Sequence, residues 1–205
     1  LGEILLFENT FAGHVDMTKR WNSRANTSGG GVLIDNGTHS VDIIRYLLGD
    51  IARIQAVEGK RFQIIDVEDT VRVLIETTNG THAAVDLSWS IDKHMPWYVS
   101  LYGSNGTILV GWKESKYKRA IDTEWTVFGS GYNKVQAFTA QLNNFCGAIR
   151  GTEALVITAE DAVASTVAID VAYQSMKTSS WVSLKPKIAS QNTCSLPSKL
   201  PKGCA

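Results

Sequence analysis

Cysteine is scarce in this sequence of 205 residues, which contains only Cys146, Cys194 and Cys204. An odd number of cysteines without close spacing argues against a disulfide framework and against a cysteine-rich zinc site. Cys146 falls in an apolar helical pattern, which predicts a position in the hydrophobic core. Cys194 and Cys204 fall in a polar tail, where they could pair or oxidise.

Net charge and long hydrophobic runs are also missing. The 20 basic residues balance the 20 acidic residues, which removes any electrostatic reason to bind nucleic acid or an anionic membrane surface. No apolar run reaches the roughly 18 residues of a transmembrane helix. Residues 1–11 lack the basic region and the cleavage site of a signal peptide and read as a strand cut from a longer chain. We therefore expect a cytoplasmic protein without nucleic-acid or membrane partners.

A dinucleotide-binding motif is absent as well, because no G-x-G-x-x-G follows a strand and no long β-α-β pattern exists to carry one. The length and the 44% hydrophobic content instead suit one globular domain, which we expect to span residues 1–184. Residues 185–205 hold three of the four prolines and four lysines with no acidic residue, which predicts a polar tail outside the core.

What the sequence does contain is a helical segment with unusual polar residues, from Ser28 to Gly49. Ser28 suits the N-cap and Gly49 the left-handed residue after the C-terminus. Asp35, His39 and Asp42 are four and three residues apart, which places them on neighbouring turns of one face. Apolar residues recur around them at helical spacing: Val32, Leu33, Val41, Ile44, Leu47 and Leu48.

The polar residues and glycines of this segment are energetically unfavourable in a helix that packs on a core. Desolvating a carboxylate and an imidazole is costly unless they are paired, and each interior glycine costs roughly 0.5–1 kcal/mol relative to alanine. Gly29, Gly30, Gly31 and Gly37 indicate that a strand, a cofactor ring or a substrate comes close to the helix backbone. Two interpretations are open: a functional site, or a tight helix–sheet contact with a buried, satisfied Asp–His pair.

The rest of the chain predicts an α+β fold. Alternating apolar residues from Asp69 to Glu76 and from Thr81 to Ile91 flank Asn79-Gly80, which predicts a type I′ hairpin. We expect six or more strands in an open, mainly antiparallel sheet with helices on one face. Two later helices are predicted. The first spans 133–150, with a core face of Val135, Phe138, Leu142, Phe145, Cys146 and Ile149. The second spans 158–177, with Ala162, Val163, Val167, Ala168, Val171 and Ala172.

The pattern G-G-G-x-L-x-D-x-G-x-H-x-x-D-x-x-x-x-L-x-G, from Gly29 to Gly49, resembles the signature helix of the Gfo/Idh/MocA oxidoreductases, which include glucose–fructose oxidoreductase and inositol dehydrogenase. V-E-D-T, N-G, G-S-N-G-T, F-x-x-A-I-R-G and T-A-E-D-A-V follow in the same order as in that family's C-terminal domain. The resemblance covers roughly residues 1–185 and implies a fold like the C-terminal domain of dihydrodipicolinate reductase.

The resemblance also implies roles for individual residues. His39 would accept or donate the substrate proton and Asp35 would orient or assist it, because these positions lie beside the nicotinamide and the reacting carbinol in the family. Gly30 and Gly31 would lie against the cofactor. Asp42 is expected to be structural and paired with a basic group.

Other implied contacts lie before and outside this helix. The segment 12–27 would contact substrate, with Lys19, Trp21 and Arg24 as candidates. The cofactor would be NAD or NADP, bound mainly by an N-terminal Rossmann domain that is absent from this chain. The whole enzyme would transfer hydride between a sugar, cyclitol or related polyol and the cofactor, and the isolated chain would be inactive.

Two alternatives remain open. Asp35, His39 and Asp42 also resemble part of a metal site on one helix face, although no further His or Cys cluster accompanies them. The second alternative is a noncatalytic domain that binds a sugar or assembles subunits. In the resembled family the exposed sheet face packs against a neighbouring subunit, so a dimer or tetramer is expected. The aromatic residues for such a face would be Trp89, Trp97, Tyr98 and Tyr102.

Overall fold

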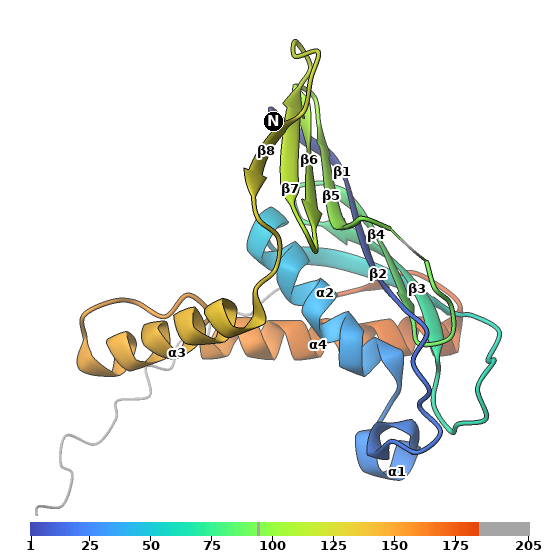
Figure 1. Ribbon diagram of the computed structural model, residues 1–205. Coiled ribbons are helices and arrows are strands. Elements are labelled where there is room, and N and C mark those ends of the chain that lie inside the picture. The colour runs from blue at the N-terminus through green and yellow to red at the C-terminus, as the bar shows by residue number, and fades with distance from the viewer. Residues whose placement is uncertain (94, 185–205) are drawn as a thin grey trace, which may run out of the picture.

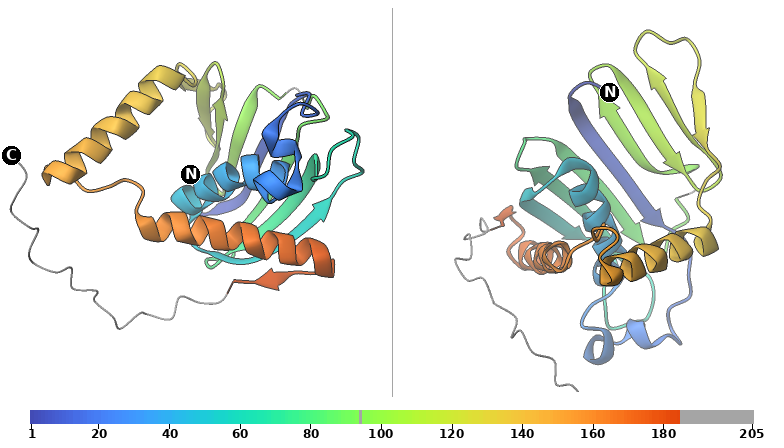
Figure 2. Two further views of the ribbon diagram at one scale, coloured as in Figure 1. Left: turned by 90° about the horizontal axis from the view of Figure 1, so that it is seen from below. Right: turned by 90° about the vertical axis from the view of Figure 1, so that its left-hand side faces the viewer.

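The computed structural model describes residues 1–93 and 95–184, so the predicted tail lies outside the described residues. A nine-stranded sheet forms the centre of the molecule, with the strand order β8-β7-β6-β5-β1-β4-β3-β2-β9. Two long helices, α2 (Val32–Leu48) and α4 (Ala159–Thr178), lie side by side across one face of this sheet (Figures 1 and 2). The predicted α+β class, with an open sheet covered on one face, is confirmed.

Strand pairing is mainly antiparallel, as expected from the short connections. The strands are β1 (Ile4–Ala12), β2 (Ile51–Glu58), β3 (Thr70–Thr77), β4 (His82–Ser88), β5 (Trp97–Gly103), β6 (Gly106–Gly111), β7 (Ser115–Arg119), β8 (Thr126–Gly129) and β9 (Val182–Ser183). β1 lies between β4 and β5, which run in opposite directions. Of the described pairs, β1 with β4 is therefore parallel, and β1 with β5 is antiparallel. The remaining pairs are antiparallel.

The hairpin between β3 and β4 differs from the predicted turn type. A type I′ turn needs positive φ at both central residues, but only Gly80 has it, with φ of 85°. The Gly80 amide donates to the Thr77 carbonyl at 3.0 Å, and the Thr77 amide donates to the Thr81 carbonyl at 3.0 Å. Type I′ is therefore wrong: this geometry is a three-residue loop with a left-handed glycine.

The helix predicted from Ser28 begins later than expected. A short helix, α1 (Ala25–Ser28), ends at Gly29, whose φ of 77° breaks the helical path before α2 starts at Val32. Ser28 therefore lies at the end of α1 and does not cap α2. Gly49 ends α2 with φ of 93°, as the predicted positive-φ residue.

The core lies between the sheet and these two helices. Leu33, Val41 and Ile44 of α2 pack on the alternating buried residues of β3 and β4. A Cβ on Gly37 would lie 3.0 Å from Leu33 Cδ1 and 3.1 Å from Leu87 Cδ1, which explains one predicted glycine by close helix–sheet contact. In α4 the N-cap residue Thr158 forms a capping box with Asp161. Of the predicted core face of α4, Ala168, Val171 and Ala172 are buried, whereas Ala162, Val163 and Val167 are exposed, contrary to prediction.

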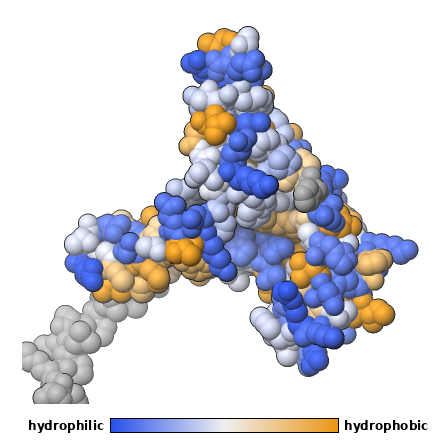
Figure 3. All heavy atoms as spheres, viewed as in Figure 1, coloured by the Kyte–Doolittle hydropathy of each residue, from blue (hydrophilic) through white to orange (hydrophobic). Residues whose placement is uncertain are grey.

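The helix α3 (Lys134–Arg150) departs most from expectation. It projects beside the sheet and makes no extensive contact with another described helix or strand (Figures 1 and 2). All six residues of its predicted core face are exposed: Val135, Phe138, Leu142, Phe145, Cys146 and Ile149. Apolar surface along α3 is visible in Figure 3. The helix itself was predicted correctly, but its burial was not.

The second face of the sheet carries no described helix. Of the aromatic residues expected there, Trp89 is buried in the core and Tyr98 stacks on Phe11 in a cavity on the helix side. Tyr102 adjoins the core residue Leu101 in β5, which places it on the uncovered face, where it donates a hydrogen bond to Glu8. Within the described residues, no helix combines the length and hydropathy that crossing a bilayer requires.

Candidate active site

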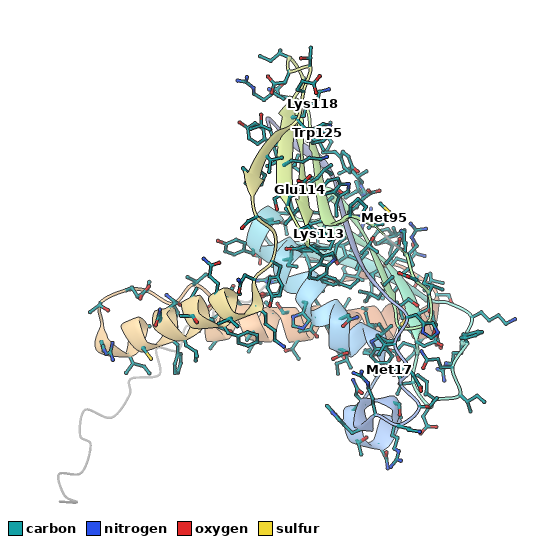
Figure 4. All side chains as sticks on the ribbon, viewed as in Figure 1. Met17, Met95, Lys113, Glu114, Lys118 and Trp125 are labelled. Carbon is teal, nitrogen blue, oxygen red and sulfur yellow. The ribbon has the colours of Figure 1, made fainter. Side chains whose placement is uncertain are left out.

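A cavity of about 1120 Å³ opens where β1 and β4 end and β5 begins, beside the middle of α2. Further walls come from the connection after β6 and from the segment before α3. Met95, Lys113 and Glu114 belong to the connections at this end of β5, β6 and β7 (Figure 4). The cavity therefore combines polar groups and aromatic rings from segments far apart in the sequence.

His39 opens onto this cavity, together with Asn36 and Ile43 of the same helix. Because successive helical residues turn by about 100°, Asn36 and Ile43 lie on one side of His39 while Asp35 and Asp42 lie on the other. The cavity side is therefore not the face that the sequence pattern indicated. Asn36, which the sequence analysis missed, faces the same space as the imidazole.

The two aspartates of the predicted face differ in their surroundings. Asp42 accepts a hydrogen bond from the Ser165 hydroxyl of α4 at 3.5 Å, so its described partner is a hydroxyl group rather than the predicted basic group. Asp35 is exposed, does not line the cavity, and has no hydrogen bond to His39 among the described residues. A catalytic pair of Asp35 and His39 therefore stays a prediction, in which His39 is the member that faces the cavity.

Glu68, from the V-E-D-T motif, holds the start of α2. Its buried carboxylate accepts hydrogen bonds from the amides of Gly31 at 2.9 Å and Leu33 at 3.1 Å. A negative charge at this end satisfies free amides and interacts favourably with the helix dipole. The Tyr173 hydroxyl of α4 donates to the same carboxylate oxygen at 2.7 Å, and burial, followed by the Glu68 charge, raises the pKa of Tyr173.

Gly30 and Gly31 have a packing reason that the sequence could not show. A Cβ on Gly30 would lie 2.0 Å from the Tyr173 hydroxyl oxygen, and one on Gly31 would lie 2.0 Å from the Glu68 carbonyl oxygen. The close approach therefore comes from within the domain, and neither glycine lines the cavity. Their predicted contact with a cofactor stays a prediction.

Asp69, the second acid of the motif, organises the rim of the cavity. Its buried carboxylate accepts hydrogen bonds from the amides of Phe62 and Gln63, both at 2.8 Å, and from the Ser90 hydroxyl at 2.7 Å. Burial raises the pKa of Asp69, but the hydrogen bonds from Gln63, Ser90 and Phe62 outweigh it and lower the pKa overall. The Gln63 side chain then donates to the Val15 carbonyl at 2.9 Å, which ties the segment after β1 to the rim.

The predicted substrate residues Lys19, Trp21 and Arg24 lie apart from the cavity. All three are exposed, and Trp21 begins the short 3-10 helix η1 (Trp21–Ser23) with 70% of its surface accessible. Of the same connection, only the earlier part, with Gly13 and Val15, lines the cavity. Met17 marks this segment near α1 in Figure 4. The structure therefore does not bring these three residues to His39, and their role in binding stays a prediction.

Aromatic rings form the wall of the cavity opposite α2. Tyr98 stacks on Phe11 with 5.8 Å between ring centroids and contacts Trp112 at 4.4 Å. Tyr132 meets Trp112 edge to face at 6.0 Å. We call Tyr98, Trp112 and Tyr132 the aromatic wall. The sequence analysis assigned none of these rings to the site, because they come from β5, the β6–β7 connection and the segment before α3.

A β-bulge turns Tyr98 into the cavity. In the β5–β6 pair Trp97 lies opposite Gly111 and Val99 opposite Val110, so Tyr98 is an extra residue in β5. An extra residue locally changes which face a side chain occupies, and such bulges are common beside active sites. Burial, with a smaller effect of Tyr132, raises the pKa of Tyr98, so its hydroxyl stays protonated at neutral pH.

One buried side chain connects this wall with the helix that carries His39. Asn9 of β1 accepts a hydrogen bond from the Ser40 hydroxyl at 2.5 Å and donates to the Tyr98 carbonyl at 2.7 Å. Ser40 directly follows His39 in α2. Asn9 therefore couples the position of the imidazole to that of the aromatic wall.

The part of the chain that the structure describes contains no cluster of side chains suited to bind a metal ion. No group of three or more His, Cys, Asp or Glu side chains there could hold a metal ion. Asp35, His39 and Asp42 therefore do not converge as the alternative interpretation required.

The fold and the cavity define a class: an α+β domain that presents a helix-borne histidine at the strand ends of an open sheet. Comparison with known proteins identifies the family. The GFO/IDH/MocA C-terminal domain matches residues 1–109, which is more than half of this chain. The chain belongs to this family.

Individual relatives cover different parts of the chain. D-apiose dehydrogenase of Rhizobium rhizogenes is 30% identical over 81 residues, or 38% of this chain and 24% of that protein. Levoglucosan dehydrogenase in complex with NADH and levoglucosan has a TM-score of 0.80 at 20% identity, covering 90% of this chain and 60% of that one. Aldose-aldose oxidoreductase from Caulobacter crescentus, complexed with glycerol, has a TM-score of 0.78 at 18% identity, with 90% and 56% covered. The chain thus shares the fold of these proteins and spans 60% or less of their length.

Proposed function

We propose that this chain forms the substrate domain of an NAD(P)-dependent dehydrogenase that acts on a sugar or related polyol, with His39 as the acid–base group. The observation that carries this proposal is the position of His39 on a cavity large enough for a sugar. Membership in the family and the names of the relatives, D-apiose dehydrogenase and levoglucosan dehydrogenase, support it.

The residues present fit the reacting end of such a site. Imidazole exchanges protons in the physiological pH range, which suits it to receive the proton of a substrate hydroxyl as the carbinol becomes a carbonyl. The nicotinamide, when bound, takes up the hydride that leaves the same carbon. The glycine-rich loop that usually holds the cofactor phosphates is absent from the sequence, so the phosphates would bind mainly outside this chain.

Replacing His39 tests this role. In the product of the complete gene, His39→Asn should lower kcat on the order of 10²–10⁴, measured as reduced nicotinamide formed with a panel of aldoses and polyols. The exposed residue Tyr46 on the same helix provides a control, because Tyr46→Phe should leave the rate unchanged. An unaltered rate in His39→Asn would remove the proposed role. The 205-residue chain alone should show no turnover, and turnover by it would refute the proposed need for a separate cofactor domain.

We also propose that the uncovered sheet face mediates self-association into a dimer or tetramer. Leu5, Val57 and Leu74 are exposed on strands β1, β2 and β3, among charged side chains. Light scattering coupled to size exclusion should give a mass above that of one chain, and Leu74→Glu should reduce it. A monomeric mass at all concentrations would contradict this assembly.

A further inference from the structure

The proton transfer proposed for His39 assigns no role to the aromatic wall. Trp112 and Tyr132 are nevertheless both 49% exposed while they line the cavity. Large aromatic surface in contact with water is unfavourable, and a ligand that covers it gains that free energy on binding. The wall therefore points to a ligand with an apolar face.

Polar groups around the wall narrow the chemistry of that ligand. Lys113 and Glu114 carry opposite charges next to each other, and the nearby Lys93 is paired with Asp86 at 2.5 Å. No single sign of charge dominates, so the lining does not favour a strongly ionic ligand. Asn36 of α2 adds an uncharged amide to the lining. An uncharged molecule with many hydroxyls and one apolar face fits this combination.

We propose that the aromatic wall is a stacking surface for the ring of a cyclic sugar, so that the substrate binds in its closed form rather than as an open-chain polyol. A closed sugar ring presents a compact face of C–H groups to an aromatic ring, whereas a flexible polyol has no such face. This proposal deepens the proposed function and rests on it for the reaction, but binding to the wall can be measured without turnover.

The backbone around the aromatic wall holds its rings in fixed positions. The bulge at Tyr98 interrupts the regular pairing of β5 with β6. The Tyr98 ring packs between the rings of Phe11 and Trp112. Asn9 holds the Tyr98 carbonyl and, through Ser40, the turn of α2 that carries His39. The ring that stacks and the imidazole that takes the proton are thus positioned relative to each other.

Binding of matched ligands to the 205-residue chain tests the proposal. The probes are methyl glycopyranosides of glucose, galactose, xylose and arabinose, which are locked as rings, and the corresponding open-chain alditols. Titrations followed by saturation-transfer NMR should show tighter binding of at least one glycoside than of its alditol. Trp112→Ala should weaken that glycoside roughly 3- to 10-fold, the size expected for one aromatic contact, and leave the alditol unchanged. Trp112→Phe should restore most of the binding.

Controls separate stacking from loss of structure. Trp125→Ala removes a tryptophan that lies outside the cavity and contacts Lys116, so it should not alter glycoside binding. Circular dichroism of Trp112→Ala should match that of the unmodified chain. Equal weakening of glycoside and alditol, or no glycoside that binds better than its alditol, would overturn the proposal.

His39→Asn distinguishes this proposal from the proposed function. The variant should bind the glycoside normally and lose turnover only in the product of the complete gene. Turnover that persisted in His39→Asn would contradict the proposed role of His39 but would not affect the proposal for the aromatic wall. If Trp112→Ala instead weakened only the nicotinamide cofactor, the wall would belong to the cofactor and the sugar proposal would fail.

Discussion

The helices α2 and α3 are each 17 residues long and carry apolar side chains at spacings of three and four. In α2 that pattern is packed, and Ile44 is 0% exposed between the sheet and α4. In α3 the same kind of pattern faces solvent within the described residues, and Ile149 is 71% exposed. Periodicity therefore predicts where a helix forms and which face is apolar, but not which element covers that face.

The two helices also differ in how they begin. The start of α2 is held by a buried carboxylate that lies 37 positions away in the sequence, at Glu68. The start of α3 is capped locally, by the Asn133 side chain on the Gln136 amide. The cap of α3 therefore lies within the helix's own segment, whereas the cap of α2 depends on the segment before β3, which carries Glu68. Local and long-range stabilisation should therefore be separable by mutation.

The largest expected effect comes from truncating matched isoleucines. Ile44→Ala should lower the free energy of unfolding by about 2–5 kcal/mol, because it leaves a cavity in a packed core. Ile149→Ala should change it by no more than about 0.5 kcal/mol, as for an exposed site. Urea denaturation of the 205-residue chain followed by circular dichroism measures both. Equal losses would show that the α3 face is packed in solution.

Substituting one glycine at the start of α2 and one in α3 tests the same difference between the two helices, with a smaller expected change in stability. Gly31→Ala should destabilise by about 1–3 kcal/mol, because the new Cβ meets the Glu68 carbonyl oxygen, which is backbone and cannot move away. In α3 a Cβ on Gly147 would lie within 2.7 Å of three atoms of the Glu153 side chain, which is exposed and can rotate away. Gly147→Ala should therefore stabilise the helix by roughly 0.5–1 kcal/mol. Thermal unfolding of the two variants gives the signs, and loss of stability in both would contradict this account.

Lowering the pH should reduce the stability of the domain through protonation of Asp69, which lies directly before β3. We expect this effect to be smaller than those of the isoleucine and glycine substitutions. The folded pKa of Asp69 is lowered, because hydrogen bonds from Gln63, Ser90 and Phe62 outweigh the burial that raises it. Its stabilising contribution is therefore complete above the unfolded pKa of about 4 and is lost as the pH falls through the lower folded value.

Asp69→Asn should accordingly be less stable at neutral pH and lose less stability on acidification than the unmodified chain. Urea midpoints between about pH 3 and pH 7 measure this slope. Glu124→Gln, at an exposed position between β7 and β8, serves as the control and should keep the original slope. A slope that Asp69→Asn leaves unchanged would rule out this role.

Much of the fold followed from local patterns in the sequence. Alternation of apolar residues identified β3 and β4, helical spacing of apolar residues identified α3 and α4, and Asn79-Gly80 marked the turn between β3 and β4. The motif from Gly29 to Gly49 placed the chain in its family and singled out His39. These features depend on residues within one or two turns of each other, which is why the sequence alone determined them.

Only the tertiary structure decided how these elements meet. It assigned the cap of α2 to Glu68, turned Asn36 rather than Asp35 toward the cavity, left α3 uncovered among the described residues, and moved Tyr98 to the helix side through a bulge. Each of these outcomes joins groups that are distant in the sequence. Their geometry depends on packing and strand register, which no local pattern specifies.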